Sequence, residues 1–182
     1  MSDIYQPEED SYLMSLILKT EIPKFLEENK DIKFIEVGCG SGIQLQTALN
    51  SGIKRENIFS CDINEEAVKH CRNLGFNSQI SNLFSKIKGK YEIIVFNPPY
   101  LPEDKKEPAS SKIATTGGKK GGELINKFLK QAKKHLTEGG RIFLLTSSLT
   151  DKIDFLDYNK KIIADKKLFF ESLFVWELSF VG

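Results

Sequence analysis

The chain of 182 residues has few metal-binding side chains and no long hydrophobic run. Its three cysteines, Cys39, Cys61 and Cys71, lack a C-x-x-C spacing, and its two histidines, His70 and His135, are far apart in the sequence. This spacing argues against a zinc site and favours small, buried cysteines that stay reduced. No apolar stretch approaches the roughly 20 residues that a membrane-spanning helix needs.

An excess of charge of either sign is also missing. Lysine and arginine number 26, aspartate and glutamate 25, and the formal net charge is +1. A protein that binds duplex nucleic acid mainly by neutralising phosphates needs more positive charge, so this class is disfavoured. The segment 1–10, MSDIYQPEED, is acidic and does not have the basic and then apolar order of a signal peptide. We therefore expect a cytoplasmic protein without a membrane segment.

The hydrophobic pattern alternates between strands and helices, which predicts an α/β fold. Such alternation is typical of right-handed β-α-β units and a mostly parallel sheet covered on both faces. The last two apolar segments have no helix between them, which indicates an antiparallel pair. Strands are expected at 33–38, 57–62, 76–81, 91–96, 141–147, 160–170 and 171–180, and helices at 10–28 (broken at Pro23), 42–52, 65–75 (capped by Asn64) and 122–136 (with Leu136 on its apolar face).

A glycine-rich turn, EVGCGSG at 36–42, joins the first strand to a helix. Gly38, Gly40 and Gly42 would let the backbone approach a ligand closely, and the helix start offers free N–H groups. Ile43 stands where a dinucleotide-binding G-x-G-x-x-G fingerprint has its third glycine, and no Walker-type G-K-[ST] follows. The turn therefore indicates a ligand site of another kind.

Asp62 ends the second strand, 24 positions after Gly38. This is close to the roughly 20 residues at which a carboxylate meets ribose hydroxyls in doubly wound folds. Alternatively, Asp62 only begins the turn before the next helix. Together with the glycine turn, it favours a ligand that contains a nucleoside.

The strand at 91–96 ends in NPPY, residues 97–100. Pro98 holds Asn97 extended, Pro99 does the same to Pro98, and neither proline can donate a backbone hydrogen bond. The Asn97 side chain and the Pro98 carbonyl are thus predicted to be two fixed acceptors for a planar NH2 group, with Tyr100 stacked on the attached plane. Such positioning suits methyl transfer to an amide or conjugated amine nitrogen, whose delocalised lone pair is a weak nucleophile. The alternative is a plain rigid turn.

The glycine turn resembles the first motif, (D/E)-x-G-x-G-x-G, of the class I S-adenosylmethionine-dependent methyltransferases. In that superfamily (N/D)-P-P-(Y/F/W) marks enzymes that methylate amino groups of adenine, guanine or glutamine. YQPEEDSYLM (5–14) and TTGGKKGGELINKFL (115–129) resemble the small HemK-like glutamine methyltransferases of eukaryotes and archaea. The resemblance covers nearly the whole chain.

The resemblance implies a Rossmann-like class I methyltransferase fold. Its sheet has seven strands, mostly parallel, with an antiparallel C-terminal hairpin and helices on both faces. Residues 1–182 would form a single methyltransferase domain. Within it, 1–30 would be a helical cap over cofactor and substrate, and 103–122 would be a substrate loop.

The resemblance also assigns roles to residues. Asp62 would bind the ribose, and Asn82 and Leu83 would border the adenine. Asn82 replaces the usual aspartate but can still accept a hydrogen bond from the adenine amino group. For Ser11, helix capping remains an alternative. The cofactor-binding set is Ser11, Glu36, Gly38, Gly40, Gly42, Asp62, Asn82, Leu83 and Asn97, the catalytic set is Asn97, Pro98, Pro99 and Tyr100, and no metal ligand is expected.

The implied activity is N5-methylation of the GGQ glutamine of a class I peptide-chain release factor. A small zinc-binding activator subunit would form a heterodimer with the chain. One alternative is a nucleic-acid adenine or guanine methyltransferase, which shares NPPY but usually needs a target-recognition domain. Another is a catalytically silent subunit that only binds cofactor or a partner. A nicotinamide oxidoreductase is disfavoured by the missing G-x-G-x-x-G.

Overall fold

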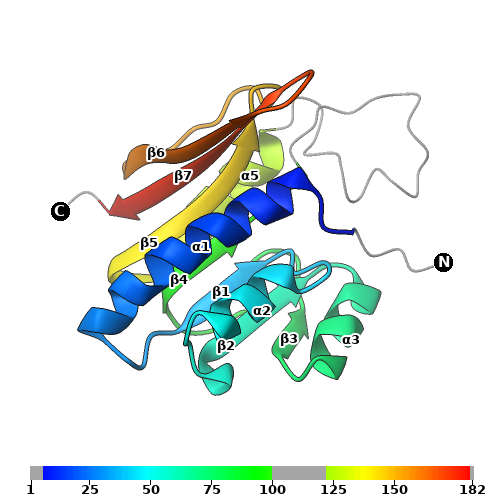
Figure 1. Cartoon of the computed structure of the whole chain (residues 1–182), viewed down its shortest axis with the longest axis vertical. Coiled ribbons are helices and arrows are strands. Elements are labelled where there is room, and N and C mark those ends of the chain that lie inside the picture. The colour runs from blue at the N-terminus through cyan, green and yellow to red at the C-terminus, as the bar shows by residue number, and fades with distance from the viewer. Residues whose placement is uncertain (1–5, 100–121, 181–182) are drawn as a thin grey trace.

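The computed structural model describes residues 6–99 and 122–180, which form one mixed sheet with helices on both faces (Figure 1). The strand order is β3-β2-β1-β4-β5-β7-β6, and β7 runs antiparallel to both of its neighbours. The expected Rossmann-like fold with its antiparallel C-terminal hairpin is confirmed. The strands are β1 (Phe34–Val37), β2 (Ile58–Asp62), β3 (Asn77–Ile80), β4 (Tyr91–Phe96), β5 (Leu136–Ser147), β6 (Tyr158–Lys167) and β7 (Ser172–Phe180), and the helices are α1 (Glu9–Glu28), α2 (Ile43–Asn50), α3 (Glu65–Asn73) and α5 (Glu123–Ala132), with a 3₁₀ turn η1 (Arg55–Asn57).

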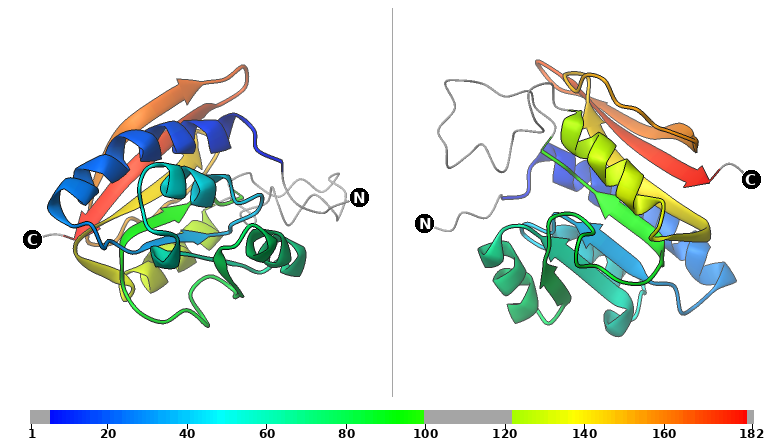
Figure 2. Two further views of the ribbon diagram at one scale, coloured as in Figure 1. Left: turned by 60° about the horizontal axis from the view of Figure 1, so that its bottom comes forward. Right: turned by 180° about the vertical axis from the view of Figure 1, so that it is seen from behind.

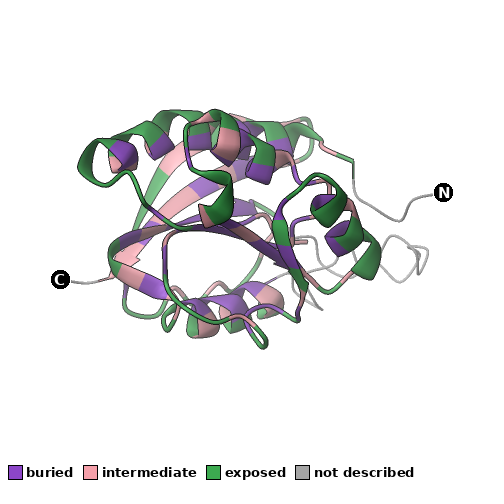
Figure 3. Ribbon diagram, turned by 90° about the horizontal axis from the view of Figure 1, so that it is seen from below, coloured by how far each residue is buried: buried purple, intermediate pink, exposed green. Residues whose placement is uncertain are grey.

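The core has two layers because successive strand residues point to opposite faces of the sheet. Phe34 and Ile93 lie in the layer that α1, α2 and α3 cover, whereas Ile35 and Ile94 lie in the layer under α5. In the right view of Figure 2, seen from behind, α5 lies in front of the sheet and α1 lies on the far face, and Figure 3 shows burial concentrated on the sheet and on the inward sides of the helices. Among the described residues, α5 is the only helix over this second layer, and Leu83 and Phe84, which follow β3, are buried in it as well.

The predicted break at Pro23 is wrong, because α1 continues through that residue. A proline in a helix removes the hydrogen bond to the carbonyl four residues earlier, here that of Lys19. Pro23 and Lys19 are both exposed, so water can satisfy the carbonyl. Buried Leu18, Ile22 and Leu26 hold the helix on the core on both sides of the proline.

The predicted end of the helix over 122–136 is also wrong. The helix α5 ends at Ala132, and the His135 N–H donates to the Ala132 carbonyl at 2.9 Å to close a turn. Leu136 then begins β5 opposite Tyr91 of β4 and is fully buried there. An apolar residue at helical spacing is also one that a buried strand accepts, so periodicity alone cannot separate the two.

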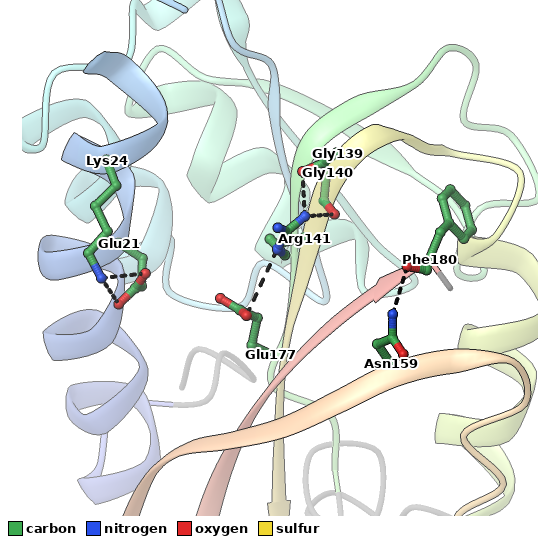
Figure 4. A network of polar contacts seen from close by, with 8 residues as sticks. All are labelled: Glu21, Lys24, Gly139, Gly140, Arg141, Asn159, Glu177 and Phe180. Carbon is green, nitrogen blue, oxygen red and sulfur yellow. Dashed lines mark hydrogen bonds and ion pairs between the residues drawn. The ribbon is translucent and has the colours of Figure 1, made fainter. Parts of the chain in front are cut away.

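The three C-terminal strands β5, β7 and β6 are mainly held together by backbone hydrogen bonds. The Arg141 guanidinium lies 3.9 Å from the Glu177 carboxylate, and the Asn159 side-chain amide donates to the Phe180 carbonyl at 3.0 Å (Figure 4). Partly exposed ion pairs of this kind add little stability. The expected strand over 160–170 ends earlier, at Lys167, so Phe169 and Phe170 lie in the turn between β6 and β7.

Within the described ranges, no helix is long and apolar enough to cross a membrane.

Truncation of Phe128 tests the layer under α5. Phe128 is fully buried, and its ring centroid lies 4.4 Å from that of Phe96 at the end of β4. Phe128→Ala should lower the free energy of unfolding by about 3–5 kcal/mol through lost burial and a cavity. Phe169→Ala, at a side chain that is 92% exposed, should change it by less than about 0.5 kcal/mol. Urea denaturation measures both, and equal losses would contradict this description of the core.

Candidate functional site

Three neighbouring parallel strands end at one edge of the sheet and bring the predicted motifs together. Strand β1 pairs with β2 on one side and with β4 on the other. The glycine turn follows β1, Asp62 ends β2, and Asn97 follows β4. In open α/β sheets this carboxyl edge is where ligands bind.

The glycine turn has a left-handed backbone at each of its three glycines. Their φ values are 73° at Gly38, 43° at Gly40 and 76° at Gly42. At Gly42, which caps α2, a Cβ would also lie 3.2 Å from the Cys71 Sγ atom. The Gly38 N–H donates to the Cys61 carbonyl of β2 at 2.7 Å. The turn therefore has a fixed backbone whose left-handed positions favour glycine.

Asp62 accepts one hydrogen bond on each carboxylate oxygen. Oδ2 accepts from the Gly40 N–H at 3.1 Å, and Oδ1 accepts from the Asn64 N–H at 2.9 Å. The residue therefore both begins the turn into α3 and faces the glycine turn, so the two interpretations of its role are compatible. An ionised carboxylate has about four acceptor positions, which leaves room for a diol.

Ile63 follows Asp62, and sequence reasoning missed it. Its side chain is 61% exposed, unusual for a residue directly after a buried strand. The signal available in the sequence was an apolar residue next to the proposed ribose carboxylate. An exposed aliphatic surface there can pack against a planar ring.

Asn82 and Leu83 follow β3 and lie beside the end of β2. The Ser81 N–H donates to the Asp62 carbonyl at 2.9 Å, and the Cys61 Sγ lies 3.4 Å from the Leu83 carbonyl oxygen. Asn82 is exposed, whereas Leu83 is buried with a φ of 51°. Their expected contact with an adenine ring stays a prediction.

Glu36 is a buried carboxylate whose two oxygens do not both have a hydrogen-bond partner. It is only 3% exposed, and Oε2 has no hydrogen-bond partner among the described residues. Burial, followed by the nearby Cys39 and Asp62, raises the pKa of Glu36 well above its usual range. A buried acid in this state gains most from a cationic ligand group.

Asn97 is held by α1 in one orientation. Its Nδ2 donates to Asp10 Oδ2 at 3.0 Å, and Asp10 Oδ1 accepts from the Ser11 N–H at 2.6 Å. Because an ionised carboxylate only accepts, the amide of Asn97 must present its nitrogen to Asp10. The buried Asn97 Oδ1 then has no partner among the described residues and is free to accept an N–H from a ligand.

Ser11 does not cap α1, because the residue at the N-cap is Glu8. Ser11 is buried, and its carbonyl accepts from Gln44 Nε2 at 2.9 Å, while Gln44 Oε1 accepts from the Ser15 hydroxyl at 2.9 Å. These bonds join α1 to α2 behind the glycine turn. A contact of Ser11 with cofactor stays a prediction.

The remaining predicted site residues belong to the NPPY motif. Pro98 is buried and Pro99 half-buried. Tyr100 and residues 103–121 of the expected substrate loop lie outside the described residues.

The three cysteines are buried and free, as expected for small core residues. Burial raises the pKa of Cys61, and a hydrogen bond with Cys71 together with burial raises that of Cys39. Raised pKa values keep the thiols of Cys39 and Cys61 protonated and weakly nucleophilic. They contribute packing beside the site.

The residues present fit an amino acid joined to a nucleoside. Glu36 suits an ammonium group, Asp62 a ribose diol, and Ile63 with Leu83 an apolar border for a base. The buried Asn97 Oδ1 lies at the same edge and suits an amide or amine N–H. S-adenosylmethionine carries the first three of these groups, so the site fits the cofactor that the glycine motif implies.

Comparison with known proteins finds relatives of this chain. The family described as "Methyltransferase small domain" matches residues 17–160. A Methanocaldococcus jannaschii protein with the provisional name protein N5-glutamine methyltransferase is 35% identical over 97% of this chain and 93% of its own length.

Two solved structures share the fold. The E. cuniculi Mtq2–Trm112 complex, described as methylating the eRF1 termination factor, matches with a TM-score of 0.71 at 22% identity, over 99% of this chain and all of that chain. The T. thermophilus 16S rRNA N2 G1207 methyltransferase, solved with AdoMet and guanosine, has a TM-score of 0.61 at 15% identity, over 97% of this chain and 44% of that chain.

Replacement of Glu36 by glutamine tests whether its buried carboxylate, when ionised, destabilises the fold. Glutamate in the unfolded chain ionises near a pKa of about 4.3, and the folded pKa is higher. Stability is therefore lost as the pH rises from the unfolded to the folded pKa. Cofactor-free Glu36→Gln should be more stable than wild type at pH 7, and the difference should fade towards pH 4.

The same variant should bind S-adenosylmethionine about tenfold more weakly or worse, because a charge-assisted contact is lost. Urea denaturation across pH and calorimetric titration measure the two effects. Equal stability of variant and wild type at every pH would contradict the account of Glu36.

Proposed function

The chain belongs to the methyltransferase small-domain family and is an S-adenosylmethionine-dependent N-methyltransferase; from this premise we propose that it methylates the side-chain amide nitrogen of a glutamine in a protein. The glutamine we propose is that of the GGQ motif of a class I peptide-chain release factor. Translation factors act in the cytoplasm, so we place the protein there as part of the same proposal.

The observation that carries the proposal is the free acceptor on Asn97. Its Oδ1 is buried without a partner among the described residues, and its orientation is fixed by the bond from Nδ2 to Asp10. A primary amide offers two N–H donors in one plane, and the Asn97 Oδ1 can accept a hydrogen bond from one of them. The rigid backbone of Pro98 and Pro99 keeps the acceptor in place.

The reaction needs positioning more than a base. The cofactor supplies an electrophilic methyl group on a sulfonium. Asn97 Oδ1 accepts one N–H of the substrate amide and so aims the nitrogen at that methyl group. Asp10 accepts from Asn97 Nδ2, and this polarises the Asn97 amide and strengthens Oδ1 as an acceptor.

The methyl transfer needs no reactant other than the cofactor and the substrate amide. The amide nitrogen forms a bond to the methyl carbon while the sulfonium–carbon bond breaks and its electron pair returns to sulfur. The nitrogen then carries a positive charge and loses a proton to water. Such a nitrogen is strongly acidic, so no strong base has to act before the transfer.

Two similarities support glutamine as the substrate. The M. jannaschii relative, which covers nearly all of this chain, is named for glutamine methylation. The E. cuniculi structure is described as responsible for methylation of eRF1. The rival substrate is a nucleic-acid base, because the T. thermophilus neighbour of the same fold binds guanosine.

We also propose a small zinc-binding activator subunit as partner. The E. cuniculi neighbour was solved as a complex with a second protein, Trm112. Here a cavity of about 640 Å³ lies by β2 and the edge strand β3, lined by residues that include Phe59, Phe76 and Tyr91. The described residues hold no group of three potential metal ligands, so the zinc would belong to the partner.

Methyl transfer from labelled S-adenosylmethionine tests the proposal. Wild type should label a class I release factor and leave its Gln→Ala GGQ variant and adenine- or guanine-containing RNA unlabelled. Asn97→Ala should lower kcat by about a hundredfold or more, as loss of an oriented donor or acceptor does at other sites. Asn97 is also expected to contact the cofactor, but the acceptor that is lost here serves the substrate, so the affinity for S-adenosylmethionine should stay within about threefold of wild type.

Each reaction is run with and without a Trm112-like protein, and activity that needs this addition supports the activator. Label on RNA alone would contradict the glutamine substrate. Full activity of Asn97→Ala would contradict the role of its side chain.

A further inference from the structure

Two phenylalanines stand at the tip of the hairpin between β6 and β7. Phe169 is 92% exposed and Phe170 is 86% exposed, and their ring centroids lie 4.7 Å apart in an edge-to-face contact. They are the most exposed large apolar side chains in the described part of the chain. We call them the phenylalanine tip.

The turn itself does not call for phenylalanine. The Leu168 N–H donates to the Glu171 carbonyl at 2.7 Å, so Phe169 and Phe170 are the two central residues of a tight hairpin turn. Such positions favour glycine, asparagine and aspartate. Neither residue packs in either core layer. The folded structure therefore explains neither side chain.

The base of the turn is anchored. The Ser147 hydroxyl at the end of β5 donates to the Glu171 carboxylate, and the Ser148 N–H donates to the Ser172 carbonyl at 2.8 Å. Leu168 is partly buried against the core. The tip is therefore held at one place, and it loses little freedom when it binds.

The phenylalanine tip lies at the same end of the molecule as the amide site. Strand β5 runs parallel to β4, so Ser147 and Asn97 are both at the carboxyl edge of the sheet. Lys166 of β6 forms an ion pair with Glu9, the residue before Asp10, which holds Asn97. Figure 1 shows the turn and the start of α1 at the same end, and both views of Figure 2 agree.

We infer that the phenylalanine tip is a docking surface for the folded protein substrate, and that it enters an apolar depression on the substrate near the methylated glutamine. The inference rests on the proposed function. Exposed Lys167 beside the tip favours an acidic rim around that depression. The amide site can hold only one side chain, so a second contact supplies affinity and register for a macromolecule.

Other occupants fit the observations less well. Two side chains are too small for a stable dimer, which buries on the order of 1,200 Å² or more. A small ligand would need a concave site, whereas this surface projects from the molecule. A contact that supplements the one at Asn97 needs only a few exposed aromatic anchors.

The test compares the double variant Phe169→Ala/Phe170→Ala with Ile162→Ala. Ile162 is also exposed and lies on β6, away from the turn, so its variant is a matched control. Wild type and both variants are each assayed on a class I release factor with the Trm112-like protein present, and steady-state methylation gives KM and kcat separately. Urea denaturation confirms that all three proteins are folded, and light scattering gives their oligomeric state.

The tip variant should raise KM for the release factor about tenfold or more, as loss of aromatic anchors does at interfaces. Its kcat and its KM for S-adenosylmethionine should stay within about twofold of wild type, and the Ile162→Ala control should match wild type. An unchanged KM for the release factor would overturn the inference, and so would a fall in kcat alone or a shift from dimer to monomer.

The proposed function fails in a different way. If wild type does not label the release factor even with the Trm112-like protein present, both proposals are overturned. An active wild type with an equally active tip variant overturns only the docking surface.

Discussion

The hydrogen bond from Asn97 Nδ2 to Asp10 Oδ2 is the interaction on which the site depends. It joins two segments 87 residues apart, the first turn of α1 and the residue after β4. An amide can bind in two orientations, and only one presents oxygen to a substrate N–H. The Asp10 carboxylate selects the orientation in which Nδ2 faces it, so the Asn97 Oδ1 is oriented as an acceptor before any ligand binds.

Much of the surrounding structure supports this bond. The helix α1 is fixed by buried Leu18 and Ile22, and Gln44 joins it to α2 through Ser11 and Ser15. On the other side, β4 is an inner strand that pairs with β1 and β5 up to Phe96, the residue before Asn97. Both partners of the bond therefore belong to rigid elements, as precise positioning of a reacting atom requires.

Both unpartnered buried oxygens of the described residues lie at the carboxyl edge of the sheet. Glu36 Oε2 and Asn97 Oδ1 are the two, and each costs folding free energy. Elsewhere buried polar groups, such as the paired hydroxyls of Ser60 and Ser78, find partners. Stability given up at this edge becomes binding free energy when ligands fill these positions.

Several features of the fold and the site were predictable from the sequence. Alternating patterns located the parallel strands, and the glycine turn, Asp62 and NPPY were each placed at strand ends, which in a parallel sheet meet at one edge. The partner of Asn97 was not predictable, because no local pattern pairs it with a residue 87 positions away. Ile63 escaped attention because one apolar residue carries no periodicity, and Leu136 and Phe169 were misassigned because apolar residues suit helix, strand and exposed turn alike.

A double-mutant cycle on Asp10 and Asn97 tests the central claim most directly. kcat/KM for release-factor methylation is measured for wild type, Asp10→Ala, Asn97→Ala and the double variant. If Asp10 acts by orienting Asn97, the double variant should be no worse than Asn97→Ala, with a coupling of about 1–3 kcal/mol between the two positions. Losses that simply add would show that the two residues act independently and would contradict the account.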